Sequence, residues 1–454
     1  MIVKKLLKPL CCFALTLCLL PAPARADYSA LPALDIQAKS ALLVYAPTGE
    51  ILYEHNIHVR REPASITKIM TTLLALEYAE KDTENGGLEA PVTAQEEDFW
   101  DIVEGGSTSN IKPGETLRLR DLLYCIMISS ANEACNIVAR YTAGSIPDFM
   151  DMMEGRLQKI GCEKTSFTNP HGLPSDDHYT TAYDIYLMIQ ECIQNKEFLK
   201  IAHNEAYTID PTDQTPEGRN LKTTNFLIAS NRPDYNYPHA RGIKTGHTAA
   251  AGHCLASLAE KNDMMLISVV LGAEKEEETG IVRSFTETKD LFEWGFNNFT
   301  VKRLIGNTTL VASTKVEKGV DADEVELVPS EAIEALVPVG LEIDKVERKI
   351  ELLHPLGKEA PVYRDEVMGT LTLAYQGREY GTVDLLAKKT IEKDIPEEAK
   401  DKIKEVIETD WVKYALIGAV ALVVLYIAIV IILNIRRRKR GRGGNYRGSK
   451  RRRR

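Results

Sequence analysis

Three short motifs in this sequence carry side chains that could together cleave a peptide bond. They are Ser65-Ile66-Thr67-Lys68, Ser130-Ala131-Asn132 and Lys244-Thr245-Gly246. Acyl transfer at a peptide bond needs a nucleophile, a base beside it, donors for the developing oxyanion and groups that hold the substrate. The three motifs supply these residue types, and they occur in this order along the chain.

The first motif could supply the nucleophile and its base. Residues three apart on a helix face the same way, so Lys68 can lie within hydrogen-bonding reach of the Ser65 hydroxyl. A helix N-terminus there would help to stabilise an alkoxide, and a buried lysine near other cations titrates low enough to accept the proton. A serine followed three residues later by a lysine arises by chance roughly once in a chain of this length, so the motif is weak evidence by itself.

The ordered triplet is far more specific than its first member. It resembles the signature that penicillin-binding proteins share with serine β-lactamases. The flanking residues narrow the resemblance to the low-molecular-weight D-alanyl-D-alanine carboxypeptidases, over roughly residues 35–390. These flanking segments are 63–71 (Pro-Ala-Ser-Ile-Thr-Lys-Ile-Met-Thr), 122–124 (Leu-Leu-Tyr), 169–173 (Asn-Pro-His-Gly-Leu) and 242–248 (Gly-Ile-Lys-Thr-Gly-His-Thr).

The resemblance implies a catalytic role for three side chains. Ser65 would be the nucleophile that forms an acyl-enzyme, and Lys68 would be its base. Ser130 would relay the proton to the leaving D-alanine. The implied activity is removal of the terminal D-alanine from peptidoglycan stem peptides that end in D-Ala-D-Ala, with β-lactam antibiotics acylating the same serine.

Five further residues are implied to bind the substrate. Asn132 would bind the stem-peptide backbone and orient the catalytic lysine, while Lys244 and Thr245 would hold the terminal carboxylate. Gly246 would let the substrate approach the strand closely. The backbone N–H group of His247, with that of the nucleophile, would form the oxyanion hole. We expect no metal and no cofactor.

Some residues near the motifs are expected to hold the fold, and others depart from the family pattern. We expect structural roles for His171, His178 and Asp184. Glu133 stands where the family frequently has Asp, and Met152-Met153-Glu154 replaces the usual Met-Asn. These departures concern fine specificity, because they lie outside the three motifs.

Three other functions compete with the carboxypeptidase. A β-lactamase needs a second base, usually a Glu ahead of an Asn on a separate loop, and the stretch after Ser130 shows no convincing Glu-X-X-Leu-Asn. A D,D-endopeptidase of the same family would cut cross-links with the same residues. A non-catalytic wall-binding scaffold would keep the fold without turnover, although all the catalytic side chains are present.

Hydrophobic patterning predicts which elements position these residues. Two short apolar runs around Pro-Thr-Gly predict a β-hairpin over 40–54, and good helix formers predict a buried helix over 65–80. Adjacent strands are predicted at 254–259 and 264–271, followed by a helix that carries Val282, Phe285, Phe292 and Phe296 on one face. Strands at both ends with helices between them predict an α+β fold of the β-lactamase/transpeptidase-like kind, an antiparallel sheet covered by helices, over residues 27–300.

The pattern changes after about residue 300. Short alternating segments at 345–353, 370–375 and 381–385, punctuated by Gly and Pro, predict a small β-rich domain over 301–390. An amphipathic spacer helix over 391–410 is predicted to follow, because Ala399, Ile403, Val406 and Ile407 recur at helical spacing.

The two ends of the chain predict export and membrane anchoring. Lysines, a short apolar run and the small-residue site Ala24-Arg25-Ala26 predict a cleaved signal peptide over 1–26. Residues 411–435 contain a continuous apolar stretch with aromatic residues before it, which predicts a transmembrane helix. The basic tail, 436–454, would stay in the cytoplasm. These features predict a single-pass protein of the bacterial cell membrane whose catalytic domain faces outward.

Composition excludes several classes of protein. The chain has 454 residues, 44% hydrophobic and 27% charged, which is typical of globular domains rather than disorder. The net charge of -9 includes the basic tail, so the exported part is more acidic still and is a poor candidate for binding nucleic acid. The cysteines that follow the signal peptide are odd in number and lack metal-ligand spacing. We therefore expect small buried side chains rather than disulfides or a zinc site.

Overall fold

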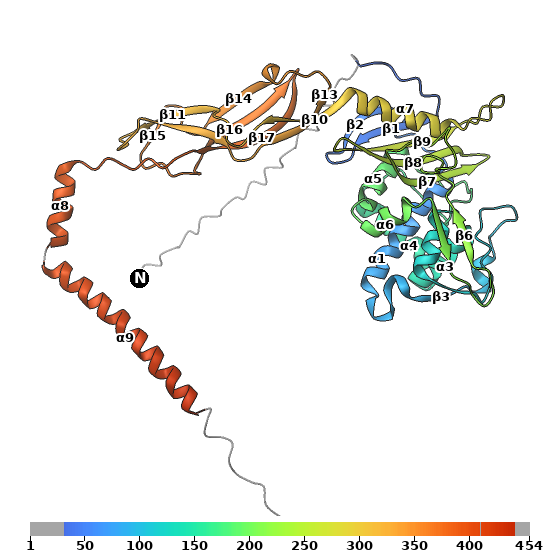
Figure 1. The fold of residues 1–454 in the computed structure, drawn as a ribbon, viewed down its shortest axis with the longest axis horizontal. Coiled ribbons are helices and arrows are strands. Elements are labelled where there is room, and N and C mark those ends of the chain that lie inside the picture. The colour runs from blue at the N-terminus through green and yellow to red at the C-terminus, as the bar shows by residue number, and fades with distance from the viewer. Residues whose placement is uncertain (1–30, 409, 441–454) are drawn as a thin grey trace, which may run out of the picture. The chain divides into compact units, whose positions relative to one another are not determined.

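The computed structural model describes residues 31–408 and 410–440 and divides into two compact units (Figure 1). The predicted signal peptide lies outside the described residues, as does the tail beyond residue 440. Of the described residues, unit 1 comprises those up to Leu304, Glu334–Glu347 and Tyr375–Tyr380, and unit 2 comprises Ile305–Ile333, Arg348–Ala374 and those from Gly381 onward.

A five-stranded antiparallel sheet forms the centre of unit 1, with the order β2-β1-β9-β8-β7. Its strands are β1 (Ser40–Tyr45), β2 (Glu50–His55), β7 (Ala240–Thr248), β8 (Gly252–Lys261) and β9 (Met264–Ala273). The predicted hairpin at the N-terminal end and the two predicted adjacent strands are confirmed. The hairpin pairs with β9, so strands from both ends of the unit meet in one sheet.

Side chains alternate across this sheet and form two cores. Leu42 and Val44 of β1 pack with residues of the helices that follow it, whereas Ala41, Leu43 and Tyr45 pack with residues of the helix α7 (Arg283–Asn298). Successive strand residues point to opposite faces, which explains the division. Figure 1 shows the sheet between α7 on one face and the other helices of unit 1 on the opposite face. The predicted α+β fold, an antiparallel sheet covered by helices, is confirmed.

Six helices and several short elements cover the second face of the sheet or extend from it. The helices are α1 (Lys68–Lys81), α2 (Leu119–Met127), α3 (Asn132–Ala143), α4 (Ile146–Ile160), α5 (Ala182–Cys192) and α6 (Lys196–Ala202). Two small hairpin-like pairs are β3 (Pro91–Thr93) with β4 (Thr116–Arg118), and β5 (Ala206–Ile209) with β6 (Arg219–Lys222). Short 3₁₀ turns are η2 (Thr83–Asn85), η3 (Gly87–Glu89) and η4 (Glu96–Phe99).

The predicted helix over 65–80 begins differently from the expectation. A 3₁₀ turn, η1 (Ala64–Thr67), precedes α1, and Lys68 is the first residue of the α-helix. The Ile66 N–H donates to Pro63 O, which is the i to i+3 bond of this tighter turn. The change preserves the predicted geometry, because residues three apart eclipse one another in a 3₁₀ turn.

Unit 2 is rich in β-structure. A six-stranded sheet has the order β14-β16-β17-β12-β11-β15, and a separate pair joins β10 (Phe299–Ile305) to β13 (Ile333–Pro338). The strands of the larger sheet are β11 (Ala312–Glu317), β12 (Glu324–Pro329), β14 (Glu347–Leu352), β15 (Lys358–Glu359), β16 (Val367–Tyr375) and β17 (Arg378–Ala387), and a 3₁₀ turn, η5, spans Ile343–Lys345. The predicted segments 370–375 and 381–385 lie within β16 and β17, and the segment 345–353 contains β14 but begins at the end of η5.

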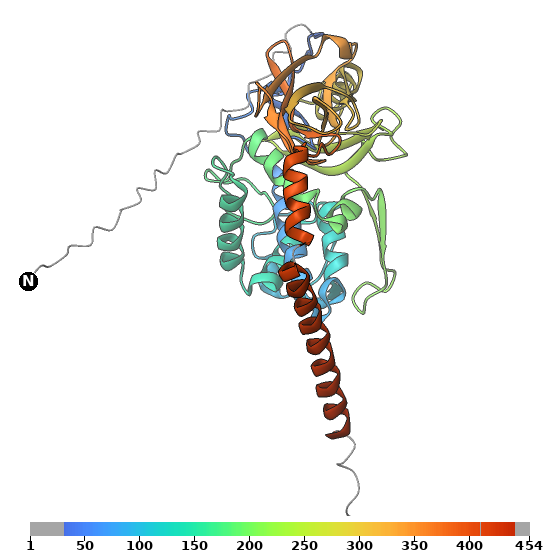
Figure 2. The same ribbon diagram turned by 90° about the vertical axis from the view of Figure 1, so that its left-hand side faces the viewer.

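Two helices end the described chain: α8 (Glu397–Glu408) and the long α9 (Asp410–Arg440), drawn in red in Figures 1 and 2. The apolar side chains Ile403, Val406 and Ile407 of α8 are exposed. Among residues 31–408 and 410–440, no helix combines the length and the apolar character that a membrane crossing requires.

The five cysteines of the described chain are all buried free thiols: Cys125, Cys135, Cys162, Cys192 and Cys254. The expectation of small buried side chains is confirmed for them. Within the described residues, no cluster of three or more His, Cys, Asp or Glu side chains could hold a metal ion.

Candidate active site

Lys68 lies at the centre of the candidate active site and is fully buried. Its Nζ donates hydrogen bonds to Ser65 Oγ at 2.8 Å, to Asn132 Oδ1 at 2.8 Å and to the backbone carbonyl of His171 at 2.6 Å. Two of these acceptors are carbonyl oxygens, which cannot donate, whereas the serine hydroxyl can do both. A neutral Lys68 that keeps both carbonyl bonds therefore has its lone pair free for the Ser65 proton.

Burial makes the neutral form of Lys68 accessible. It lowers the pKa of Lys68 to about 8, against the opposing influence of Cys135 and Glu133. An amine that titrates near 8 is neutral in roughly one molecule in ten at pH 7 and can exchange its proton readily. Lys68 thus has both the position and the acidity of a general base for Ser65.

A second serine–lysine pair lies in the same site. Lys244, which is also buried, donates from Nζ to Ser130 Oγ at 3.0 Å and to Thr245 O at 2.9 Å. Burial, and after it the nearby Lys68, lower the pKa of Lys244 well below its usual value. Ser130 therefore connects Lys244 to the cavity through a hydroxyl that can both accept and donate.

A cavity of about 420 Å³ opens beside these two pairs. Of the eight site residues predicted from the sequence, six line it, and the ammonium groups of Lys68 and Lys244 reach it through the serine hydroxyls that they contact. The six lining residues are Ser65, Ser130, Asn132, Thr245, Gly246 and His247. The structure therefore brings all eight together, although they come from three separate parts of the sequence.

Strand β7 forms one wall of the cavity and lies against the nucleophile turn. A side chain at Gly246 would place its Cβ 2.9 Å from Pro63 O and 3.2 Å from Ser65 N, so only glycine allows this approach. Thr245 is fixed through its hydroxyl by Thr224, whose Oγ1 lies 2.7 Å away. Close packing of the strand on the turn holds the His247 end of β7 and the Ser65 N–H beside the same cavity.

Other residues of the cavity lining were not singled out by the sequence. Gly105, Gly106 and Ser107 line the cavity, and so does Phe226. The glycines supply no functional group that a sequence reading could recognise as chemistry. The only sequence signal for the two glycines is their position about two dozen residues before Ser130.

His171 contributes to the site through its backbone as well as its ring. Its Nδ1 accepts from the Leu173 N–H at 3.2 Å, so Nε2 carries the proton and donates to Asp101 Oδ2 at 2.9 Å. Burial lowers the pKa of His171, against the opposing hydrogen bond to Asp101. The ring is therefore a neutral anchor that fixes the carbonyl to which Lys68 donates.

His178 and Asp184 contact other residues of the fold and are absent from the cavity lining. The His178 Nδ1 accepts from the Thr168 N–H at 3.0 Å, so its Nε2 donates to Thr67 Oγ1 at 2.9 Å. Burial lowers the pKa of His178 to about 3, which keeps the ring neutral. Asp184 accepts from the Lys164 N–H at 2.9 Å.

Gly172 packs closely against the turn that carries Ser65. Its replacement gives a testable prediction. A Cβ at Gly172 would lie 1.9 Å from Ala64 O, and its φ is +91°. Gly161 has the same φ with nothing within 4 Å of a Cβ. We expect Gly172→Ala to lower the free energy of unfolding by about 3 kcal/mol, from backbone strain plus steric overlap, and Gly161→Ala by only about 1 kcal/mol.

Thermal or denaturant unfolding of the two alanine variants measures this difference. Because backbone strain is common to both positions, the excess loss at Gly172 reports the contacts of its Cβ with Ala64 and Thr67. Equal losses at Gly172 and Gly161 would contradict the close packing of the turn.

Comparisons with known proteins agree with this site. The family described as D-alanyl-D-alanine carboxypeptidase, peptidase family S11, matches residues 26–275, and the penicillin-binding protein 5 C-terminal domain matches residues 299–393. D-alanyl-D-alanine carboxypeptidase DacF of Bacillus subtilis is 32% identical over 358 residues, which are 79% of this chain and 86% of that protein. DacC of Escherichia coli is 30% identical over 363 residues, 79% of this chain and 85% of that protein.

Solved structures share the fold as well. Penicillin-binding protein 5 from Haemophilus influenzae superposes with a TM-score of 0.61 at 25% identity, covering 80% of this chain and all of the other. Penicillin-binding protein 6B from Escherichia coli has a TM-score of 0.62 at 23% identity, which supports the fold alone. From the family match and the relatives together, the chain belongs to the D-alanyl-D-alanine carboxypeptidases of serine peptidase family S11.

Proposed function

We propose that this protein removes the terminal D-alanine from peptidoglycan stem peptides that end in D-Ala-D-Ala, with Ser65 as the nucleophile. The observation that carries the proposal is the arrangement around Lys68. Its Nζ lies 2.8 Å from Ser65 Oγ and makes its other two hydrogen bonds to carbonyl oxygens of Asn132 and His171. That arrangement directs the only available lone pair of a neutral amine at the serine.

Acylation follows from the positions of these groups. Neutral Lys68 accepts the Ser65 proton while Oγ attacks the carbonyl carbon of the penultimate D-alanine. The backbone N–H groups of Ser65 and His247 are the donors for the oxyanion that forms. Collapse of this intermediate breaks the peptide bond and leaves the peptide as an ester on Ser65.

The second pair of residues would serve the leaving group. Ser130 would relay to the amine of the departing D-alanine the proton that Lys68 took from Ser65, while Lys244 holds the Ser130 hydroxyl through their shared hydrogen bond. The substrate carboxylate beside Lys244 and Thr245 would favour the charged form of the lysine, because an opposite charge nearby opposes the effect of burial. Water then attacks the ester, and Ser65 regains its proton as the shortened peptide leaves.

The same first step explains acylation by β-lactams. A strained amide that carries a carboxylate can present its carbonyl to Ser65 and its carboxylate to Lys244 and Thr245. The ring nitrogen stays tethered to the acyl group after the bond breaks, so a leaving group remains near Ser130. No step requires a metal or a cofactor.

We also propose that the protein is exported and held in the bacterial cell membrane by a single helix. The support is in the sequence: the signal-like residues 1–26, the apolar stretch within 411–435 and the basic residues 436–454. The catalytic domain would face the cell wall and the basic tail the cytoplasm.

Product analysis with the full chain in detergent tests the proposed activity. We expect D-alanine and the tetrapeptide from a pentapeptide ending in D-Ala-D-Ala, and no product from the matched peptide ending in D-Ala-L-Ala. Cleavage of cross-linked dimers without D-alanine release would replace the proposal by a D,D-endopeptidase. β-Lactam acylation with neither product would indicate a scaffold that has kept only the acylation step.

A further inference from the structure

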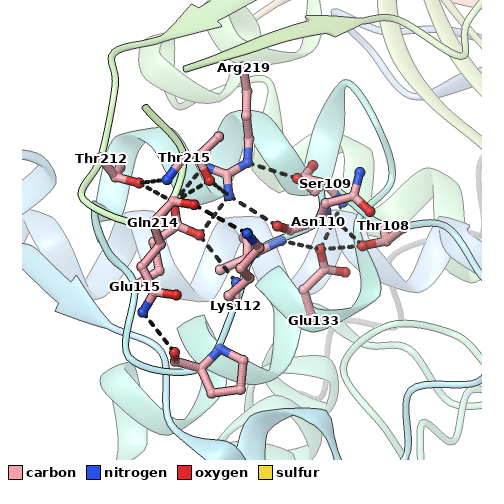
Figure 3. Close-up of polar contacts among 12 residues, drawn as sticks. Thr108, Ser109, Asn110, Lys112, Glu115, Glu133, Thr212, Gln214, Thr215 and Arg219 are labelled. Carbon is pink, nitrogen blue, oxygen red and sulfur yellow. Dashed lines mark hydrogen bonds and ion pairs between the residues drawn. The ribbon is translucent and has the colours of Figure 1, made fainter. Parts of the chain in front are cut away.

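Glu133 follows the catalytic-motif residue Asn132 in α3, and its side chain is buried. Its Oε1 accepts hydrogen bonds from Thr108 Oγ1 at 2.7 Å, from the Ser109 N–H at 2.7 Å and from the Ile111 N–H at 3.5 Å. Figure 3 shows Thr108 and Ser109 converging on this carboxylate. The second oxygen, Oε2, is buried without a hydrogen-bond partner in the described chain. A single oxygen of Glu133 therefore holds the segment 107–111, through Thr108, Ser109 and Ile111, against the start of α3.

The held segment is itself bonded to the second catalytic motif. Ser109 Oγ lies 2.6 Å from the Oγ of Ser129, the residue before Ser130. The Asn132 N–H donates to Ser107 O at 2.9 Å. Two hydrogen bonds thus connect the segment with both sides of the Ser-Ala-Asn motif.

Ser130 needs such support because of its backbone conformation. Its φ is +62°, in the left-handed region that a residue with a side chain adopts only when its surroundings enforce it. In this conformation its Oγ lies 3.0 Å from Lys244 Nζ. Loosening the bonds on either side would let the backbone relax and move the hydroxyl away from the leaving group.

The far side of the segment is fixed by a buried ion pair, which Figure 3 shows. Arg219 donates from Nε to Ser109 O at 2.8 Å and from Nη2 to Asn110 O at 3.1 Å, and the same guanidinium contacts both oxygens of Glu115. Although burial acts in the opposite direction, the hydrogen bonds from Arg219 and others lower the pKa of Glu115 to about 2. The segment is therefore held between Arg219 on one side and Glu133 on the other.

We propose that Glu133 is a positioning residue for Ser130 and Asn132, which it holds in place by fixing the segment 107–111 against the start of α3. This inference rests on the roles proposed above for the two motif residues. It assigns Glu133 no contact with the substrate. The relevant property of the side chain is an oxygen that accepts hydrogen bonds at this point.

The charge of Glu133 has a separate effect that the test must distinguish from positioning. The carboxylate opposes the lowering of the pKa of Lys68 by burial. A leucine at position 133 removes both the charge and the acceptor. A glutamine removes the charge but keeps an acceptor oxygen of the same reach, and its amide can occupy the place of the unpartnered Oε2.

The test is the second-order rate constant for acylation of the full chain in detergent by a fluorescent penicillin, well below the Tm of each variant. We expect Glu133→Leu to acylate about 30- to 100-fold more slowly, because displacement of a reacting group by about 1 Å has an effect of this size. Glu133→Gln should stay within about threefold of the parent, because the acceptor remains. Its rate should rise at a lower pH, because the pKa of Lys68 falls when the charge is removed.

Two further variants show whether the effect passes through the segment. Ser109→Ala removes the bond to Ser129, and we expect a loss of about tenfold. In that background Glu133→Leu should slow acylation by much less than in the parent, because both changes interrupt one connection.

Arg156→Leu is the matched control, since it removes ion pairs with Glu77 and Glu191 away from the cavity. It should lower the Tm and leave the acylation rate unchanged.

Three results would overturn the inference: parental acylation by Glu133→Leu, a glutamine variant as slow as the leucine variant, or multiplicative effects of Ser109→Ala and Glu133→Leu. If the leucine variant fails to fold, the glutamine variant and Ser109→Ala still test the positioning role of Glu133. Parental acylation by Ser109→Ala would then contradict that role. Failure of the parent itself to be acylated would refute the proposed function instead.

Discussion

Ser65→Ala is expected to abolish both D-alanine release and covalent labelling by a β-lactam, with a loss of at least about 10⁴-fold in rate. The physical reason is the set of neighbours of Lys68. Its other two hydrogen-bond acceptors are carbonyl oxygens, which cannot act as nucleophiles. Ser130, the other serine of the motifs, is bonded to Lys244 instead. Removal of one oxygen atom therefore leaves the base without a nucleophile to activate.

Mass spectrometry of the intact protein after β-lactam treatment, together with D-alanine release, measures this loss. The variant should keep a Tm close to that of the parent, because the turn retains the Thr67 hydroxyl bond to Ala64 O and the other two bonds of Lys68. Ser65→Cys is a useful companion, since it keeps a nucleophilic atom at the same position. A covalent adduct on the alanine variant, mapped to another serine, would show that the nucleophile has been assigned wrongly.

The sequence predicted the sheet well because its signals are local and repetitive. Short apolar runs in residues 40–54 and on either side of Asn262 and Asp263, each bounded by turn residues, indicate strands that are buried on both faces. Both of these turn residues adopt positive φ, as a tight turn between antiparallel strands requires. The pairing of β1 with β9 follows from the same patterning only once the helices between them are placed. The α+β class could therefore be predicted, whereas the strand order could not.

The start of the nucleophile helix shows the limit of periodicity. Apolar spacing indicates a helix over 65–80 but does not distinguish an α-turn from a 3₁₀ turn at its first residues. The packing of Gly246 and Gly172 against residues 63–65 accompanies the tighter turn. Both glycines lie far away in the sequence, so no local pattern includes them.

The side chains of the site were recognisable from their types, but its backbone groups were not. Ser65, Lys68 and Ser130 carry unusual chemistry at recognisable spacing. The carbonyl of His171, which accepts from Lys68, and the lining residues Gly105 and Gly106 belong to the site only because of where the fold places them. A backbone carbonyl has the same chemistry at every residue, so only the folded chain shows which one faces Lys68.

Lys68→Met is expected to slow acylation by about 10³- to 10⁴-fold while leaving Ser65 in place. Methionine fills a similar volume in this fully buried position but cannot accept a proton. It also leaves Asn132 Oδ1 and the His171 carbonyl without their donor, so we expect a loss of stability of about 1–3 kcal/mol. Rates must therefore be measured well below the Tm of the variant.

The pH dependence of the parent follows from the same group. Lys68 acts as a base only when neutral, and burial lowers its pKa to about 8. The neutral fraction, and with it the rate of β-lactam acylation, should rise from roughly one tenth of its maximum at pH 7 to roughly nine tenths at pH 9. Lys68→Met should show no such rise, because the titrating group is absent.

Lys68→Arg separates proton transfer from charge. Arginine keeps a positive charge and several N–H donors but does not deprotonate in this pH range. If Lys68 acts as the base, the arginine variant should be as slow as the methionine variant, and its slow rate should not increase between pH 7 and pH 9. If Lys68 acts only as a fixed cation that stabilises the Ser65 alkoxide, the arginine variant should retain much of the parental rate. An arginine variant with near-parental acylation would therefore require another route for the Ser65 proton, and Ser130 with Lys244 is the nearest pair that could provide it.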